Sequence, residues 1–285
     1  MNLSNARQRV LSGKWAIRKE NLFALYEDIN QLTDVRMGGI FGKVFGDPVL
    51  AQIEKVSTTE AVNNSEDLGD IAILTINGTL VKGANQMEQL LLGYVNTDDI
   101  SKQLDDLLAD ASVKCIILNF ISWGGEVTGI PELARKIKQV DSIKPVYGWC
   151  EQHMCSAAMW LASQCRFIGA TPSSTVGSIG VWQMFMDVSE AMEKAGIKTK
   201  YISSGKYKLI GSDSKPMTPE EEDILTKEIV KIHDSFKNAV LGTRSKVEPD
   251  TMEGLCYTGE DALDKNLVDV CVDDFTEFLE IITNQ

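Results

Sequence analysis

The chain has 285 residues, of which 44% are hydrophobic and 24% charged, so it is long enough for one large domain or two ordinary ones. Its formal net charge of -13 repels phosphate backbones, which argues against nucleic-acid binding as the main task. No apolar run approaches the ~20 residues that span a bilayer, and the N-terminus lacks the apolar core of a signal peptide, so we expect a cytoplasmic protein without membrane insertion.

Residues 1–68 are predicted to form a mainly helical N-terminal extension that ends in a linker. Helical patterns alternate there with the Gly-rich stretch 35–48, and the polar stretch 54–70 has little periodicity. The segment LFALYEDINQ, residues 22–31, follows a basic amphipathic start and is suited to docking on a partner protein. The main domain is expected over residues 69–285.

Strands and helices alternate along the main domain. Apolar runs predict strands at 71–81 (with a turn signal at Asn77-Gly78), 113–121, 144–150, 166–172, 198–204 and the end of 259–274. Helical spacing predicts helices at 97–110, 131–140, 156–165, 186–197, 219–245 (with Thr218 as its cap) and the start of 259–274, with loops at 122–129 and 174–184. This alternation predicts an α/β fold with mostly parallel strands joined by right-handed βαβ crossovers.

The six cysteines lie at positions 115, 150, 155, 165, 256 and 271, and no CxxC pair occurs. Several stand in apolar runs, which is typical of buried free thiols in a reducing compartment. Cys150, His153 and Cys155 form a short cluster of metal-ligand types, but no second pair of ligands completes it. We therefore expect no metal site.

Ser156 stands between a polar turn and an apolar run, where a serine is most often a helix cap. As a nucleophile it would need a base within hydrogen-bond reach. The chain has only two histidines: His153 is too near in sequence to come from a separate element, and His233 lies inside the long predicted helix. Lys206 and Lys208 are the alternatives, because a lysine amine can act as a base once burial or a like charge lowers its pKa.

An oxyanion hole needs backbone N–H groups that no side chain obstructs. Gly124 and Gly125 directly follow the predicted buried strand 113–121 and can supply such amides, and Ala157 adds another if Ser156 opens a helix. Each motif also has a plain structural explanation, because a Gly-Gly pair after a strand is most often a turn. It is their order along the chain that favours a catalytic site.

From about Ile71 to Phe275 the chain resembles the signal peptide peptidase A family of serine peptidases, which have the ClpP/crotonase-type fold and include phage head-maturation proteases. The resemblance rests on motifs in the family's order: ILTINGTLV, FISWGGEV, CSAAMWLAS, TPSSTVGSIGV, SSGKYKLIGSDSKPMTPEE and YTGEDALDKNLVD. Two segments depart from the family pattern, because Trp123 replaces a proline and Ala157-Ala158 replaces Gly-Gly. These changes affect the expected substrate subsite and leave the nucleophile and the base in place.

The resemblance implies a ClpP/crotonase-like spiral of βαβ units and a role for each motif residue. The roles are Ser156 as nucleophile, Lys208 and not Lys206 as general base, Ser178 as the hydroxyl that orients the lysine, and Gly124, Gly125 and Ala157 as oxyanion-binding amides. The implied reaction is peptide hydrolysis through an acyl-enzyme, which requires neither a metal nor an organic cofactor.

The resemblance leaves the biological role open between two branches. A phage protease that trims scaffold and capsid proteins in the host cytoplasm or prohead is favoured, and a soluble bacterial peptidase is the alternative. A homo-oligomeric ring is expected, in which a neighbouring subunit can complete the lysine base. A crotonase-type acyl-CoA enzyme and a catalytically silent assembly protein are the rival classes.

Overall fold

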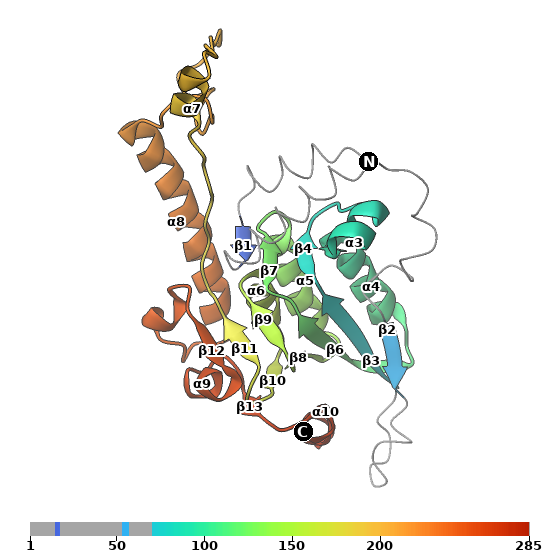
Figure 1. The fold of residues 1–285 in the computed structure, drawn as a ribbon. Helices are drawn as coiled ribbons and strands as arrows, with labels where there is room; N and C mark the ends of the chain where they lie inside the picture. Colours follow the sequence, from blue (N-terminus) through green and yellow to red (C-terminus); the bar gives the residue numbers. More distant parts are fainter. Residues whose placement is uncertain (1–14, 18–52, 57–69, 285) are drawn as a thin grey trace.

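The computed structural model describes residues 15–17, 53–56 and 70–284 (Figure 1). Its strands are β1 (Trp15–Ile17), β2 (Ile53–Val56), β3 (Asp70–Asn77), β4 (Thr79–Val81), β5 (Tyr94–Asn96), β6 (Val113–Ile121), β7 (Gly124–Glu126), β8 (Val146–Cys150), β9 (His153–Cys155), β10 (Phe167–Ala170), β11 (Thr175–Gly177), β12 (Cys256–Thr258) and β13 (Val270–Cys271). Its helices are α3 (Gln86–Leu92), α4 (Thr97–Ala109), α5 (Ile130–Asp141), α6 (Ala157–Ala162), α7 (Ser189–Lys194), α8 (Pro219–Leu241), α9 (Gly259–Asp264) and α10 (Phe275–Thr283), with the 3₁₀ helix η1 (Pro249–Met252).

The described strands form three sheets. Their orders are β13-β10-β8-β6-β3-β2, β1-β7-β4-β5 and β12-β11-β9. Neighbouring strands pair in parallel except for β1 with β7, β2 with β3 and β11 with β12. The predicted class, an α/β fold with mostly parallel strands, is confirmed.

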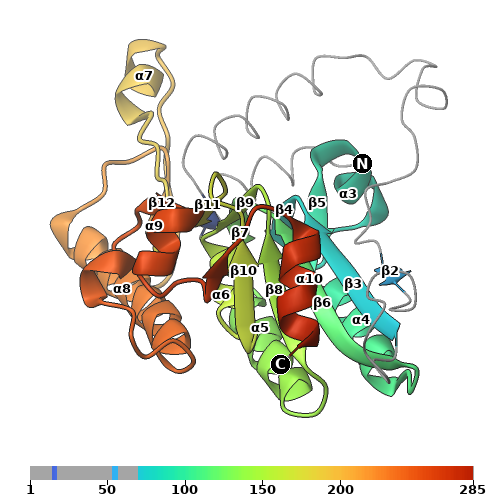
Figure 2. The same ribbon diagram turned by 90° about the horizontal axis from the view of Figure 1, so that it is seen from below.

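The six-stranded sheet is buried on both faces. Along β3, Ala72 and Leu74 belong to the larger core, whereas Ile71 and Ile73 belong to a second core on the opposite face. This period of two is what a strand covered on both sides requires. Helix α10 supplies Phe278 to the second core, and Figure 2 shows α10 and α5 on opposite sides of β8.

The turn at Asn77-Gly78 carries the chain from one sheet to another, because β3 and β4 belong to different sheets. Gly78 has a φ of 129° and donates its N–H to the carbonyl of Ile121 at 3.0 Å. A Cβ at this position would collide with the carbonyl oxygen of Gly93. Glycine is therefore required here both for its backbone angle and for space.

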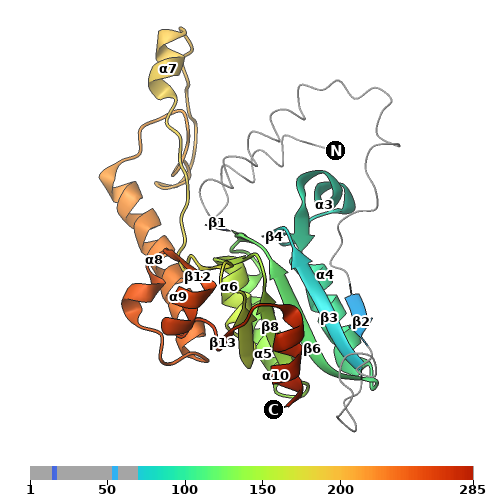
Figure 3. The same ribbon diagram turned by 60° about the horizontal axis from the view of Figure 1, so that its bottom comes forward.

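Helix α8 begins in the predicted way and is anchored near its other end. Thr218 caps it, and Glu221 returns a hydrogen bond to the Thr218 N–H in a capping box. Nearer the C-terminus, Phe236 is fully buried and stacks on Trp160 of α6, with 4.4 Å between ring centroids. The first turns of α8 extend away from the sheets together with α7, as Figures 1 and 3 show.

Several predicted elements differ from the observed ones. The predicted strand 198–204 is wrong. These residues are exposed and form no strand, because they do not lie beside a sheet with which they could pair. Helices α6 and α7 are shorter than predicted, and the predicted loop 122–129 contains strand β7. Helices α3 and α10 were not anticipated, although Asn85 and Glu88 form a capping box at α3.

The predicted extension, residues 1–68, lies mostly outside the described residues. Its described parts are the strands β1 and β2, and not helices. Strand β2 occupies the beginning of the predicted linker and pairs with β3, while β1 pairs with β7. The segment 22–31 and its proposed docking role fall outside the described residues, and the boundary between extension and domain stays a prediction.

The stacked pair on α6 and α8 predicts a large stability effect. Phe236→Ala removes a fully buried ring and should lower the free energy of unfolding by about 3–5 kcal/mol, measured by urea denaturation. Val230→Ala on the same helix is the control, because Val230 is 50% exposed and its truncation should change stability by less than about 0.5 kcal/mol. Equal effects of the two substitutions would contradict the anchoring role of the pair.

Candidate active site

Ser156 lies at a sharp, strained junction between β9 and α6. Its backbone angles are φ 55° and ψ -119°, an unusual conformation for a residue with a Cβ. Its carbonyl accepts the Trp160 N–H at 2.9 Å, but its side chain makes no capping hydrogen bond. The interpretation of Ser156 as an ordinary helix cap is therefore wrong, and its hydroxyl is not committed to the helix.

Three short parallel segments bring the predicted residues together around Ser156. On one side, Ser122 and Met154 form a parallel β-bridge. Gly124 follows Ser122 by two residues, and Ser156 follows Met154 by two residues. On the other side, β11 pairs in parallel with β9 with Gly177 opposite Cys155, so Ser178 and Ser156 are the next residues of their strands. The register places Ser156 between Gly124 and Ser178.

Hydrogen bonds fix this register on both sides of the buried Ser156, which is 1% exposed. The N–H of Ser156 donates to the carbonyl of Gly177 at 2.7 Å. The N–H of Cys155 donates to the carbonyl of Ser122 at 3.0 Å, and the N–H of Ser122 donates to the carbonyl of His153 at 2.8 Å. The central segment is thus held by backbone bonds to both neighbours.

Ser178 is half-buried and, like Ser156, has a positive φ, of 53°. Its N–H donates to the carbonyl of Leu255 at 2.7 Å. The next carbonyl, that of Ile179, lies 3.2 Å from His233 Nε2, which is also 2.8 Å from the carbonyl of Met252. His233 therefore ties α8 to the segment that carries Ser178, consistent with its interpretation as a helix residue and not a base.

Gly124 and Gly125 belong to β7 and do not form a simple turn. Gly124 has a φ of 112°, and its N–H donates to Ser122 Oγ at 3.2 Å. A Cβ at Gly125 would collide with the carbonyl oxygen of Leu80 on β4. The strand therefore requires glycine for packing, and the absence of side chains lets another backbone approach it closely.

Ser122 is a supporting residue that the sequence reasoning missed. Its hydroxyl donates to the carbonyl of Gly78 at 2.6 Å and accepts the Gly124 N–H, so it joins the corner after β3 to β7. It is buried, at 1% exposure. A serine at the end of a buried apolar strand was the available signal, because a buried hydroxyl needs partners.

The departures from the family pattern lie beside the nucleophile. Trp123 stacks on His153, with 4.3 Å between ring centroids and 10° between the ring planes. Burial lowers the pKa of His153, which favours the neutral imidazole. His153 begins β9, the strand that leads into Ser156, so this aromatic pair lies at the start of that strand.

The cysteines are free thiols, as predicted. Burial raises the pKa of Cys150 to about 12 and that of Cys115 to about 11, so both are protonated and inert at neutral pH. Within the described part of the chain, no group of three or more His, Cys, Asp or Glu side chains is arranged to hold a metal ion.

Lys208 is not brought to Ser156 within the chain. It is exposed, as are all residues from 193 to 208. Its neighbours Lys206 and Tyr207 both hydrogen-bond Glu220 in the first turn of α8, and the hydrogen bond to Glu220 raises the pKa of Lys206. Glu220 precedes His233 by 13 residues, a distance of about 20 Å along the helix at ~1.5 Å per residue.

The predicted residues therefore fall into two groups. The nucleophile, the second serine and the amides share one place, whereas the segment between α7 and α8 lies at the outer end of α8, away from β9 and β11 (Figures 1 and 3). The lysine role stays a prediction. Lys206 is engaged by Glu220, which leaves Lys208 as the better candidate of the two.

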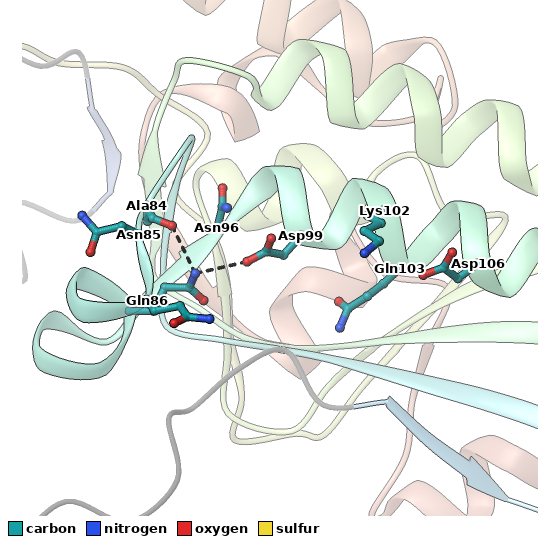
Figure 4. Close-up of a pocket in the computed structure, with 9 residues that line it drawn as sticks. Ala84, Asn85, Gln86, Asn96, Asp99, Lys102, Gln103 and Asp106 are labelled. Atoms are coloured by element: carbon teal, nitrogen blue, oxygen red, sulfur yellow. Dashed lines mark hydrogen bonds between the residues drawn. The ribbon is translucent and has the colours of Figure 1, made fainter. Parts of the chain in front are cut away.

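A separate pocket of about 470 Å³ lies between α3 and α4 (Figure 4). All its lining residues except Ala84 are polar or charged, and Gln89 Nε2 donates there to Asp99 Oδ2 and to the carbonyl of Ala84, both at 3.1 Å. The pocket contains none of the predicted catalytic residues. We therefore place the candidate active site at Ser156.

Comparison with known proteins assigns this region to a peptidase family. The model of peptidase family S49 matches residues 138–279, which include Ser156, Ser178 and Lys208, so this part of the chain belongs to peptidase family S49. The predicted resemblance to signal peptide peptidase A and phage capsid proteases is thereby confirmed at the level of the family.

Two relatives indicate the range of this similarity. The chain is 40% identical over 169 residues to the MJ0651 protein of Methanocaldococcus jannaschii, covering 58% of this chain and 54% of that one. It is 29% identical over 257 residues to the capsid assembly protease C of Escherichia phage lambda, covering 86% of this chain and 56% of that one. The chain thus spans about half the length of these relatives.

Among solved structures, the membrane-bound stomatin-specific protease 1510-N matches with a TM-score of 0.43 and 15% identity, over 73% of this chain and 82% of that one. A score this low assigns no function.

The backbone strain at Ser156 predicts an inverted stability order between two variants. Ser156→Gly and Ser156→Ala both lack the hydroxyl, but only alanine keeps the Cβ at a φ of 55°. The glycine variant should be the more stable by about 1–3 kcal/mol in urea denaturation. Glycine is normally the less stable residue because of its backbone entropy, so an alanine variant of equal or greater stability would contradict the strain.

Proposed function

We propose that this chain is a serine endopeptidase that uses a Ser-Lys dyad and an acyl-enzyme intermediate. The observation that carries the proposal is the register that sets the strained Ser156 between Gly124 and Ser178, inside a region that belongs to peptidase family S49. Acyl transfer needs a nucleophile beside backbone amides that can hold the oxyanion, and the surroundings of Ser156 supply both.

The proposed reaction proceeds in two steps. Ser156 Oγ attacks the peptide carbonyl while Lys208 Nζ takes its proton, and the amine product leaves with that proton. Water then hydrolyses the ester to Ser156, and no metal or cofactor takes part. Backbone N–H groups of Gly125 and Ala157 stabilise the oxyanion, and Gly124 joins them when its N–H leaves Ser122 Oγ.

The base is proposed to come from a neighbouring copy of the chain. Lys208 is exposed at the outer end of α8, whereas Ser156 is buried near the other end of that helix. A homo-oligomer in which this outer segment reaches the next subunit would bring Lys208 of one copy to Ser156 and Ser178 of another.

The outer segment has the surface that such an assembly needs. Exposed apolar side chains gather on residues 182–218, which we call the arm: Phe185, Met186, Ile197, Tyr201, Ile202 and Tyr207. Ile202 is 92% exposed, which is costly for an isolated chain and is normal for an interface. Sedimentation at the mass of a single chain would contradict the oligomer.

A phage head-maturation role is favoured within this activity, with scaffold or capsid proteins as substrates. The similarity to the lambda capsid assembly protease covers 86% of the chain, more than residues 69–285 alone, so it includes part of the predicted extension. Signal-peptide-peptidase-like hydrolysis in a bacterial cytoplasm is the alternative. Within the described residues, no helix is long and apolar enough to cross a membrane.

Two rival classes make different demands on the chain. A crotonase-type acyl-CoA enzyme would not require Ser156 on a strained turn beside Ser178. A catalytically inactive assembly protein would require the arm for association but would not require Ser156. Tight acyl-CoA binding without peptide hydrolysis would favour the former, and assembly without hydrolysis would favour the latter.

Intact-mass spectrometry with unfolded casein tests the activity. We expect fragments with the wild type and a loss of at least about 10⁴-fold in rate for Ser156→Ala and for Lys208→Ala. Ser178→Ala should lose up to about 10²-fold, because it orients the amine and does not transfer the proton.

Lys206→Ala is the matched control for Lys208→Ala and should retain activity, because Lys206 is engaged by Glu220. If Lys206→Ala were inactive and Lys208→Ala active, the assignment of the base would be wrong. Casein fragments that persist in Ser156→Ala would contradict the nucleophile itself.

A further inference from the structure

Strand β7 would be a sheet edge if β1 were absent, because the sheet order is β1-β7-β4-β5. An edge strand presents unpaired N–H and C=O groups to any extended chain that lies beside it. Here the edge strand contains Gly124 and Gly125, whose lack of side chains leaves their backbone accessible. The same strand carries the amides assigned above to the oxyanion.

Strand β1 fills this edge with residues from far away in the sequence. It runs antiparallel to β7, with Trp15 opposite Glu126, Ala16 opposite Gly125 and Ile17 opposite Gly124. Gly124 in turn follows Ser122 by two residues, and Ser122 bridges Met154, which precedes Ser156 by two residues. The backbone of residues 15–17 therefore runs alongside the strand that carries the two glycines of the candidate site.

An extended peptide can bind a sheet edge by adding a strand, with backbone hydrogen bonds supplying affinity. Such binding suits a peptidase, because a cleavable segment must be extended and its carbonyl must lie beside the nucleophile and the oxyanion amides. An antiparallel strand on β7 satisfies both conditions. Strand β1 has this geometry and belongs to the same chain.

We propose that residues 15–17 occupy the place of the substrate strand and that β1 is an intramolecular competitor of the substrate. The substrate is then an extended, unfolded polypeptide segment that pairs antiparallel with β7 after β1 has left. This inference rests on the proposed peptidase function for its consequence in catalysis, but the pairing site on β7 can be tested by binding alone.

A release variant tests the competition. Consecutive N–H groups point to opposite sides of a strand, so the double substitution Ala16→Pro and Ile17→Pro removes whichever of the two faces β7. Combined with Ser156→Ala, which prevents cleavage, it should bind fluorescein-labelled unfolded casein more tightly in fluorescence anisotropy. If β1 is docked about nine-tenths of the time, the apparent Kd should fall about tenfold.

The matched control for the release variant is Ala16→Thr with Ile17→Val. Both residues keep their N–H groups and favour strands, so casein binding should equal that of Ser156→Ala alone. Hydrogen exchange of residues 124–126 provides the second readout: their amides should lose protection in the proline variant and keep it in the control.

A locked variant tests the opposite direction. Trp15 and Glu126 are directly opposite on antiparallel strands, and such Cα atoms lie about 4.5–5.5 Å apart, within reach of a disulfide. Trp15→Cys with Glu126→Cys should lose casein binding when oxidised and regain it on reduction. Glu126→Cys alone is the control and should bind equally in both states.

The outcomes separate this inference from the proposed function. If the lock abolishes binding and the release strengthens it while no variant hydrolyses casein, β1 is a competitor and the peptidase proposal fails. If the wild type hydrolyses casein and the oxidised lock hydrolyses it equally fast, the peptidase stands and the inference is overturned. Absence of casein binding in the release variant would also overturn it.

Discussion

The parallel alignment of three short segments around Ser156 is the constraint on which the candidate site depends. The central segment ends in a residue whose positive φ is stabilised by backbone hydrogen bonds to both neighbours, through Ser122 and Gly177. A strained conformation persists only when its surroundings fix it from several sides. The burial of α6 and its stacking on α8 complete that support, so the geometry of the site is a property of the whole domain.

The arm has the opposite character. Sixteen consecutive exposed residues, 193–208, include the proposed base and several apolar side chains. Polar contacts such as that between Tyr201 and Ser212 join this segment to residues close to it in the sequence. If two copies of the chain meet, the proposed site combines the buried serine of one copy with the exposed lysine of the other. Under the proposed shared site, a chain released before assembly would carry the proposed nucleophile without the proposed base. Occupation of β7 by β1 would add a second restraint on the same site.

Much of the main domain could be predicted from the sequence, because its strands and helices follow their periodicities closely. The run 113–121 and the capped start at Thr218 appear where expected. The missed elements depend on tertiary contacts. Strand β7 has only three residues, two of them glycine, and exists because β4 and β1 pair with it. The predicted strand 198–204 has suitable alternation but lies on no sheet.

The residues of the candidate site could be predicted from the sequence, but their positions relative to one another could not. The order of the motifs predicted Ser156, Ser178 and the glycines as site residues, and the strand pairing brings their segments together. The separation of Lys208 from Ser156 and Ser178 could not be predicted from the sequence. Lys206 and Tyr207 hydrogen-bond Glu220 at the outer end of α8, and the local pattern GKYK does not indicate this contact. The role of Ser122 was hidden for a similar reason, since its partners Gly78 and Gly124 meet only in the folded sheets.

A mixing experiment tests the central claim, that one catalytic site takes its serine and its lysine from two chains. Ser156→Ala and Lys208→Ala chains are co-expressed with different affinity tags, purified through both tags, and assayed for hydrolysis of unfolded casein. The account predicts that each variant alone is inactive and that the mixed assemblies regain about one quarter of the wild-type rate, because random neighbours restore only sites that combine an intact serine with an intact lysine. Mixed assemblies that remain inactive would contradict the shared site.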